Sequence, residues 1–528
     1  MNFSCTTQKQ KDDLIVTNSN IYTVNDKLPK AESFAVIDGK FIGVGSSEEI
    51  RSAFKSKNIL DAGGKTIVPG LIDGHCHFYN LGTGLQKVEL RGTRSYKEVL
   101  ERLEQFQKEK KLGFIQGRGW DQNDWEEKEF PDKGALDKLF PNTPVALTRI
   151  DGHAMLVNQA TLDLAGIDEN TEVEGGEVIK ENGRLTGVLI DNAKGMVNRI
   201  IPSLSKKQSI QALMDAQDVC LEKGLTTVSD AGLAKEIIDL IDSLQQKDVL
   251  KIKIYAMISA HPDNFDHYLK TGPIKTEKLN VRSFKVYADG ALGSRGAALK
   301  EPYSDREGHF GALVTSTEDL SSIARLLANS EFQMNTHAIG DSANAYVLKT
   351  YARELKSRTN RRWRIEHAQV IDPEDFDYFT EIIPSVQPTH ATSDMYWAED
   401  RLGPDRIKGA YAYKDLLNIN GRIVLGTDFP VEKVDPMLTF YAAVARKDLT
   451  GYPDNGFESK NRLSREETLK GMTLWAAYAN FEENEKGSIE ENKYADFVIL
   501  DKNMMDVEIE EVPNIEINGT YINGEKVN

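Results

Sequence analysis

The middle of the chain alternates short apolar runs with amphipathic stretches, which is the pattern of strands alternating with helices. Ser205 and Gln208 form a capping-box pattern that predicts a helix start, with Ile210 and Leu221 on one side of that helix. Gly224 is placed to end it. Strand-like runs lie at 66–72, 226–229, 252–258, 281–287, 333–336, 363–366, 382–387 and 423–426.

Eight strands alternating with helices predict a (β/α)8 barrel of the TIM type. An open doubly wound sheet is the alternative, but no glycine-rich phosphate loop follows the first strand. Residues 80–204 interrupt the alternation. We expect them to be an insertion after the first strand that covers the barrel mouth and shapes the substrate pocket.

Both ends of the chain carry β-rich runs separated by turn signals. Asp38-Gly39 lies between two such runs and predicts a hairpin, and Asn518-Gly519 is a similar signal near the other end. We therefore expect one small β-sandwich domain assembled from both termini. The predicted boundaries are 13–70 and 484–528 for the β-sandwich and 71–483 for the barrel, with the insertion at 80–204.

Composition narrows the class of protein and its partners. Of the 528 residues, 40% are hydrophobic and 28% are charged, as in a globular protein, and the net charge is −17. An acidic chain repels phosphates, which argues against nucleic acid and anionic membranes as partners. No apolar stretch is long enough to span a bilayer, so we expect a cytoplasmic protein. The alternative is a bacterial lipoprotein anchored at Cys5, if an upstream signal is missing from the sequence.

Side chains with metal-binding chemistry gather at the predicted carboxyl ends of the strands, where barrel enzymes hold their active sites. His75 and His77 end the first strand two residues apart, which places both rings on one face. The other strand ends carry Lys285, His337, His367 and Asp428. Imidazoles and a carboxylate suit Zn²⁺, with Mn²⁺ or Fe²⁺ as lesser alternatives. A catalytic zinc keeps one position open for water, and Asp428 is placed to accept the proton of that water.

Several short motifs follow one another in a fixed order. They are Pro-Gly-Leu-Ile-Asp-Gly-His-Cys-His at 69–77, Asp-Gly-His-Ala-Met-Leu-Val-Asn at 151–158, Thr-Gly-Val-Leu-Ile-Asp-Asn-Ala at 186–193, Asp-Gly-Ala-Leu-Gly-Ser-Arg at 289–295, Thr-His-Ala-Ile-Gly-Asp at 336–341, Ile-Glu-His-Ala-Gln at 365–369, Gly-Thr-Asp-Phe-Pro-Val at 426–431, and Lys-Gly-Ser-Ile-Glu through Ala-Asp-Phe-Val-Ile-Leu at 486–500. Together they resemble the metal-dependent amidohydrolase superfamily, and within it the branch typified by N-substituted formamide deformylases. The resemblance covers nearly the whole chain.

The resemblance implies a set of metal ligands and a general base. It implies that His75, His77, His337 and His367 bind one or two divalent metals, and that Asp428 is both ligand and base. In many superfamily members a lysine on strand four is carboxylated by CO₂ and bridges two metals, which implies the same role for Lys285. Without that modification, a buried Lys285 must lose its charge or form an ion pair, for example with Asp289.

The resemblance also points to residues that contact the substrate. His153 is similar to a family position that faces the substrate, so we expect a catalytic role for it, with a structural role as the alternative. Arg295 and Asp289 lie in the loop after strand four, where Arg295 could bind a substrate carboxylate. A salt bridge from Arg295 to Asp289 or Asp305 is the structural alternative. We also expect Trp120 to line the substrate pocket, although a single tryptophan more often serves packing.

The predicted function is hydrolysis of the C–N bond of a small amide, with a formamide-like or N-acyl substrate. A cyclic amide, a carbamate or a deamination on the same site is the first alternative. The second is an amidohydrolase-like binding protein without catalysis, against which the complete set of ligands argues. A homo-oligomer is compatible with the sequence.

Overall fold

The computed structural model describes residues 14–150, 152–173, 176–356 and 358–528. The chain divides into two compact units. The main unit contains the residues up to Tyr79 together with Gln217–Asn528, and the inserted unit is Asn80–Ala216. Cys5, the expected anchor of the lipoprotein alternative, lies outside the described residues. No helix within the described ranges is long and apolar enough to cross a membrane.

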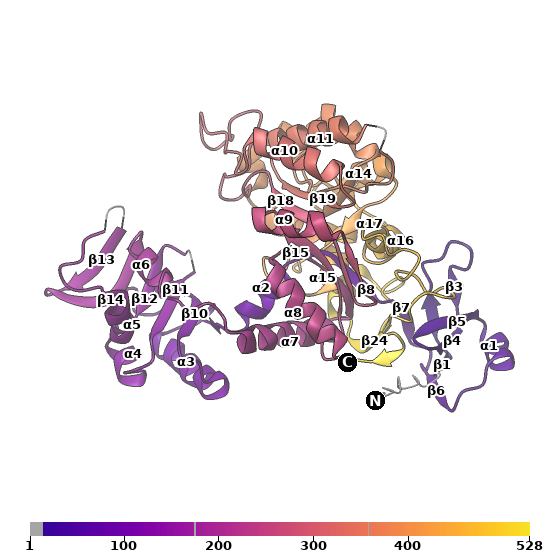
Figure 1. Cartoon of the computed structure of the whole chain (residues 1–528), viewed down its shortest axis with the longest axis horizontal. Coiled ribbons are helices and arrows are strands. Elements are labelled where there is room, and N and C mark those ends of the chain that lie inside the picture. Colours follow the sequence, from indigo (N-terminus) through magenta and orange to yellow (C-terminus); the bar gives the residue numbers. More distant parts are fainter. Residues whose placement is uncertain (1–13, 151, 174–175, 357) are drawn as a thin grey trace. The chain divides into compact units, whose positions relative to one another are not determined.

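A barrel of parallel strands forms the centre of the main unit (Figure 1). Each strand pairs with the next one along the chain, in a single parallel series. In the described part of the chain the series has eight members: β8 (Leu71–Cys76), β15 (Leu225–Leu233), β16 (Lys253–Ser259), β18 (Leu279–Tyr287), β19 (Gln333–Ala338), β20 (Arg364–His367), β21 (Ile383–Val386) and β22 (Val424–Leu425). The short strand β17 (Ile274–Lys275) adds to β18 in the antiparallel direction. The predicted barrel is thus confirmed.

Backbone hydrogen bonds bring the two ends of this series together. The Asp428 N–H donates to the His75 carbonyl, and the His77 N–H donates to the Phe429 carbonyl, both at 2.8 Å. These bonds join the end of β8 to the segment after β22. The ring of strands therefore closes at the carboxyl ends, where the predicted ligands lie.

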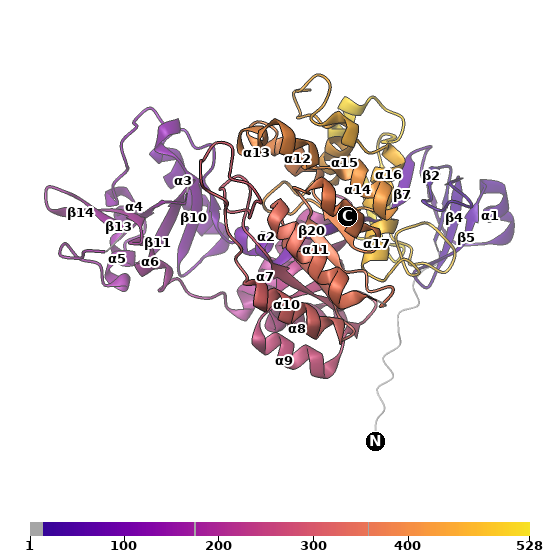
Figure 2. The same ribbon diagram turned by 90° about the horizontal axis from the view of Figure 1, so that it is seen from above.

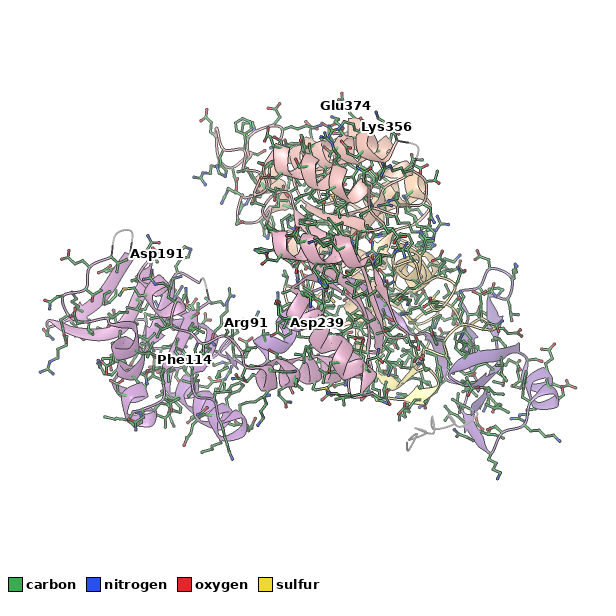
Figure 3. The ribbon with its side chains drawn as sticks, in the orientation of Figure 1. Arg91, Phe114, Asp191, Asp239, Lys356 and Glu374 are labelled. Carbon is green, nitrogen blue, oxygen red and sulfur yellow. The ribbon has the colours of Figure 1, made fainter. Side chains whose placement is uncertain are left out.

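Helices cover the outside of the barrel, as Figures 1 and 2 show for α8 to α11. Their buried residues are apolar along one side, for example Ile238, Ile241 and Leu244 on α8. Charged side chains such as Asp239 on α8 and Glu374 lie on the solvent side (Figure 3). The main helices of this layer are α8 (Lys235–Gln246), α9 (Pro262–Thr271), α10 (Thr317–Ala328), α11 (Asp341–Leu355), α12 (Pro388–Asp394), α13 (Ala398–Arg406), α14 (Tyr413–Asn420), α15 (Pro436–Ala445), α16 (Arg465–Gly471) and α17 (Leu474–Ala479).

The run at 66–72, predicted as one strand, belongs to two sheets. Its first part is β7 (Thr66–Pro69) in a terminal sheet, and the barrel strand β8 begins at Leu71. Gly70 separates them, and its N–H donates to the Asp496 carbonyl at 2.8 Å. A Cβ at Gly70 would lie 2.2 Å from the Thr226 hydroxyl oxygen, so only glycine fits where the chain passes from one sheet to the other.

Both ends of the chain build the terminal β domain, as the turn signals predicted. One sheet has the order β5 (Lys40–Gly45), β4 (Ser33–Ile37), β1 (Leu14–Thr17), β6 (Asn58–Asp61), and the other the order β25 (Glu525–Lys526), β24 (Ile517–Ile522), β23 (Phe497–Leu500), β7, β2 (Asn20–Tyr22), β3 (Lys30–Ala31). Asp38 and Gly39 join β4 to β5 with positive φ angles of 49° and 75°, which fits the predicted hairpin turn. Phe34 and Phe497, from opposite ends of the sequence, lie with ring centroids 4.9 Å apart in the shared core.

The inserted unit is an α/β domain with its own sheet. The sheet order is β13 (Gly176–Glu181), β14 (Arg184–Asp191), β12 (Ala154–Val157), β11 (Val145–Arg149), β10 (Ile115–Trp120) and β9 (Val88–Glu89). Its helices include α3 (Tyr96–Lys110), α4 (Gly134–Leu139), α5 (Gln159–Ala165) and α6 (Lys194–Asn198). Two hydrophobic clusters form its core, one around Trp120 and Leu103 and the other around Met155 and Leu162. The boundaries expected for the insertion and for the terminal domain stay predictions.

Candidate metal centre

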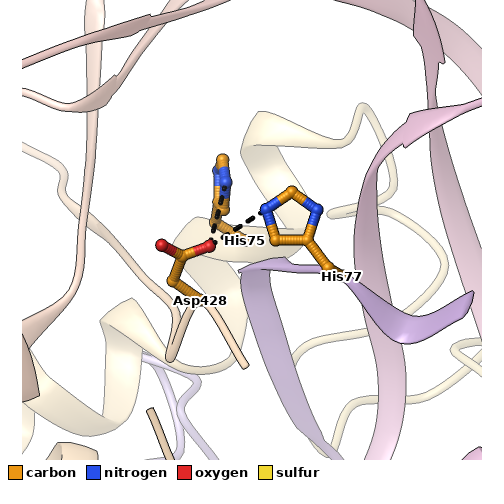
Figure 4. A group of neighbouring side chains, drawn as sticks. All are labelled: His75, His77 and Asp428. Carbon is orange, nitrogen blue, oxygen red and sulfur yellow. Dashed lines mark ion pairs between the residues drawn. The ribbon is translucent and has the colours of Figure 1, made fainter. Parts of the chain in front are cut away.

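The carboxyl ends of β8 and β22 place two histidines beside one aspartate (Figure 4). Asp428 Oδ1 lies 3.2 Å from His77 Nε2 and 3.7 Å from His75 Nε2. Two glycines allow this approach. A Cβ at Gly74 would lie 2.2 Å from Val424 Cγ1, and one at Gly426 would lie 2.5 Å from the His75 backbone nitrogen. Larger residues at these positions would push the two strand ends apart.

Each of three imidazoles is oriented through its Nδ1 atom. His75 Nδ1 lies 2.5 Å from Glu366 Oε2, His77 Nδ1 lies 3.0 Å from the Ala231 carbonyl, and His367 Nδ1 lies 2.8 Å from Gln387 Oε1. All three partners are acceptors, so each Nδ1 carries a proton, and in the neutral ring Nε2 keeps its lone pair. This is the arrangement that fixes metal-binding histidines in proteins.

Glu366, next to His367 on β20, is the charged partner of His75. Burial opposes its ionisation, but His75, Arg364 and Lys285 together hold the pKa of Glu366 at about 2. The ionised carboxylate therefore keeps His75 in one tautomer. Burial also lowers the pKa of the His75 imidazole, which favours a neutral ring with a free Nε2 lone pair.

Asp428 lies close to both His75 and His77. Burial opposes its charge, but the surrounding imidazoles, first of all His77, hold the pKa of Asp428 well below its ordinary value. Its Oδ1 has no hydrogen-bond partner among the described residues, although His77 Nε2 is only 3.2 Å away. An imidazole nitrogen and a carboxylate oxygen at this distance are placed to bind the same metal ion.

The expected ligands Lys285 and His337 also lie at this end of the barrel. Lys285 is 1% exposed, and its Nζ lies 2.9 Å from His75 Nε2. Burial lowers the pKa of Lys285 to about 8, although Glu366 and Asp428 oppose that shift. Within the described ranges Lys285 forms no ion pair with Asp289, the structural alternative considered above.

His337 is adjacent to the other imidazoles but points differently. Its ring centroid is 4.5 Å from that of His367, while its Nε2 lies 3.7 Å from Asp289 Oδ1. Burial lowers the pKa of His337 to about 3, so the ring is neutral and able to bind a metal.

Two groups of potential ligand atoms stand out in the part of the chain that the structure describes. They are His75, His77 and Asp428, and His367, His390 and Asp428, and within each group the ligand atoms lie within 4.8 Å of one another. Imidazole nitrogens and a carboxylate oxygen are suitable ligands for a divalent transition metal. The side chains therefore fit a divalent metal ion at this end of the barrel.

His390 was not predicted from the sequence. It lies in the first turn of α12, directly after β21, and its Nε2 is 3.8 Å from Asp428 Oδ2. The same rule that selected the other candidates, a histidine just beyond a strand end, would have found it if extended a few residues past the seventh strand. Tyr287, at the end of β18, also lies near these histidines: its ring centroid is 5.6 Å from that of His337, and 42% of its surface is exposed.

The predicted substrate-binding residues have partners within the fold. Arg295 forms an ion pair with Asp305, with 2.7 Å between Nη2 and Oδ2, which is one of the structural alternatives. Asp289 is buried and accepts the backbone N–H groups of Ala298, Ile339 and Gly340. It thereby holds the loops after β18 and β19 together. Roles of Arg295 and Asp289 in substrate binding stay predictions.

The two candidates in the inserted unit have different environments there. Trp120 is buried and its Nε1–H donates to the Leu147 carbonyl at 2.8 Å, which favours the packing alternative. His153 is largely exposed, and its Nδ1 lies 2.7 Å from Asp191 Oδ1. The expected roles of His153 in catalysis and of Trp120 in substrate binding stay predictions.

Comparison with known proteins agrees with this geometry. A model of the amidohydrolase family matches residues 58–528, so the chain belongs to the amidohydrolase family, whose members are hydrolytic enzymes that act on carbon–nitrogen bonds. The chain is 33% identical to the protein LONG AFTER FAR-RED 3 of Arabidopsis thaliana, over 98% of this chain and 91% of the relative. It is 24% identical to the N-substituted formamide deformylase of Arthrobacter pascens, over 98% of each chain.

Solved structures show the same fold. An uncharacterised metal-dependent hydrolase from Pyrococcus horikoshii superimposes with a TM-score of 0.80 at 27% identity, over 94% of this chain and 99% of the other. The resemblance read from the motifs is therefore confirmed at the level of the family. The chain is thus a metal-dependent hydrolase, and its barrel holds groups of histidine and aspartate that could bind a metal ion.

Proposed function

We propose that this protein hydrolyses the C–N bond of a small formamide-like or N-acyl amide, with zinc as its metal. The observation that carries the proposal is the set of imidazoles whose Nε2 atoms converge around Asp428 while their Nδ1 atoms are held by acceptors. His75, His77, His367 and Asp428 are the ligands that the geometry favours most. The full-length similarity to an N-substituted formamide deformylase supports the choice of substrate class.

Different residues of the site have different roles in the proposed reaction. A divalent metal bound here would activate water and polarise the substrate carbonyl. Asp428, kept ionised by its neighbours, accepts the proton of the attacking water and returns it to the departing amine nitrogen. Glu366 fixes the tautomer of His75, and Gln387 fixes that of His367. No nucleophilic serine or cysteine is required for this reaction.

We further propose that Lys285 is carboxylated in the active protein. As an ammonium it would donate to His75 Nε2, the atom that a metal needs. The neutral amine adds to the carbon of CO₂ and releases one proton, which gives a carbamate with anionic oxygen ligands. This removes a buried cation and adds a ligand beside His337 and Asp428. A carbonyl signal in the ¹³C NMR spectrum after incubation with ¹³C-bicarbonate, absent in Lys285→Ala, tests the proposal.

The function is tested by metal analysis together with a hydrolysis screen. The panel contains N-formyl amines, N-acyl amines, cyclic amides, carbamates and aminated heterocycles. Bound zinc with turnover of the first two classes supports the proposal. Turnover confined to another class would replace the substrate assignment, and metal-free protein inert to the whole panel would favour a binding protein.

The variant Asp428→Asn tests the proton transfer while keeping the fold of the site. The amide keeps the shape of the carboxylate but is a poor proton acceptor, so kcat should fall by about 100-fold or more. Circular dichroism and the thermal midpoint should stay close to those of the unaltered protein. Full activity in the variant would refute the role of Asp428 as general base.

A further inference from the structure

His390 presents a buried nitrogen to the metal site. Its Nε2 has no hydrogen-bond partner among residues that the structure describes, and 13% of the side chain is exposed. An unpaired buried imidazole nitrogen costs free energy unless another group uses its lone pair. The nearest charged atom is Asp428 Oδ2, at 3.8 Å.

The local structure holds the His390 ring in that position. Gln387 is the N-cap of α12; its carbonyl accepts the His390 N–H at 3.1 Å and also the Tyr413 hydroxyl at 2.9 Å. The side chain of the same Gln387 accepts from His367 Nδ1. One residue therefore fixes both the ring of His367 and the turn that carries His390.

The rings of His367 and His390 and the carboxylate of Asp428 lie close together. The rings of His367 and His390 are nearly parallel, with 16° between their planes and 6.1 Å between centroids. The ligand atoms of His367, His390 and Asp428 lie within 4.8 Å of one another. Two ligands on one tetrahedral zinc are about 3.3 Å apart, given metal–nitrogen bonds of about 2.0–2.1 Å.

Asp428 offers a different oxygen to each group. Oδ1 faces His75 and His77, whereas Oδ2 faces His390. A carboxylate in this position can bridge two ions. Resting on the proposed function, we infer that His390 is a metal ligand, and that His367, His390 and Asp428 hold a second metal ion next to the first.

The test measures metal binding rather than turnover. The full-length protein is stripped with a chelator and titrated with Zn²⁺ for stoichiometry and with Co²⁺ for its absorption spectrum. We expect two ions per chain in the unaltered protein. His390→Asn and His390→Gln should keep one tightly bound ion and bind the second at least about 100-fold more weakly, because a ligand is lost. The ion that remains at His75 and His77 shows that the barrel is folded.

His261→Asn is the matched control. His261 is exposed at the N-cap of α9, where asparagine is an equally good cap, and it should leave both ions bound. Two ions with an unchanged Co²⁺ spectrum in both His390 variants would overturn the inference while leaving the proposed hydrolase intact. A single ion in the unaltered protein would also overturn it. Protein that binds no metal would overturn the proposed function as well.

Discussion

Single residues in this site act through the tautomer and charge that their neighbours impose. Glu366 contributes no ligand atom to either group, yet its ionised carboxylate determines which nitrogen of His75 carries the proton. Gln387 does the same for His367 with a neutral amide. The residues that orient the proposed ligands can thus be tested separately from the ligands themselves.

Replacing Glu366 by Gln should weaken metal binding without abolishing it. The amide oxygen can still accept from His75 Nδ1, but without the charge that polarises the ring. We expect an affinity about 10–100-fold lower, measured by competition with a chromophoric chelator. Asp239→Asn, an exposed change on α8, serves as the control. An affinity equal to that of the unaltered protein would show that the charge of Glu366 is irrelevant.

Asp230 makes the stability of the metal-free protein depend on pH. Burial raises its pKa to about 7, while its carboxylate accepts the N–H groups of Phe78 and Tyr79. Because the folded pKa lies above the unfolded value of about 3.9, the stabilising contribution is full below that value and is lost as the pH rises through 7. Between pH 5.5 and 8.5 the free energy of unfolding should fall by about 2 kcal/mol relative to Asp230→Asn.

Urea unfolding of both proteins at several pH values, after chelation, checks this prediction. The Asn side chain does not titrate, so only the unaltered protein should carry this pH dependence. Parallel curves for the two proteins would mean that Asp230 has an ordinary pKa in the folded state.

At the scale of elements, the site depends on how closely β8 and β22 approach. Gly74→Ala would place a methyl group 2.2 Å from Val424 Cγ1 and 2.9 Å from the Leu425 carbonyl oxygen. We expect a loss of about 1–3 kcal/mol in stability, with weaker metal binding, because His75 and Asp428 move apart. Gly113→Ala, where a Cβ meets nothing within 4 Å, should change neither quantity. Thermal unfolding and metal titration distinguish the two variants.

Most of the barrel strands and the helix start at Ser205 could be predicted from the local sequence pattern. The strand runs and the capping box at Ser205 and Gln208 depend on local periodicity and side-chain hydrogen bonding, and both appear in the structure. The division of 66–72 at Gly70 could not be predicted, because it results from Thr226 and Asp496, which are distant in sequence. The position of the His390 side chain could not be predicted for a related reason. His390 lies in the first turn of a helix beyond a strand end, so the direction of its side chain depends on packing around Gln387.

At the scale of the whole molecule, the chain combines two units with separate cores. The inserted unit has its own six-stranded sheet and two hydrophobic clusters within the described residues. Its length falls in the range of single domains, about 50–250 residues. This explains why residues 80–204 disturbed the alternation of strands and helices: they follow a different fold.

The inserted unit should therefore fold when produced alone as residues 80–216. We expect a cooperative thermal transition and a dispersed amide spectrum, because its apolar clusters are built from its own residues. The fluorescence of Trp120 and Trp125, both buried, should be that of indoles shielded from water. A non-cooperative transition with exposed tryptophan would show that the unit needs the rest of the chain.

The pairing of β7 with β23 has a consequence for biosynthesis. Ile67 is opposite Ile499 in the ladder, and β7 leads through Gly70 directly into β8, the strand that carries His75. During translation β7 leaves the ribosome long before its neighbour exists. One edge of this strand must remain unpaired until β23 at 497–500 has been made, with the exposure to aggregation that an open edge brings. Assembly of the terminal domain therefore waits for β23, and a chain terminated before residue 497 would leave the first barrel strand without its anchor.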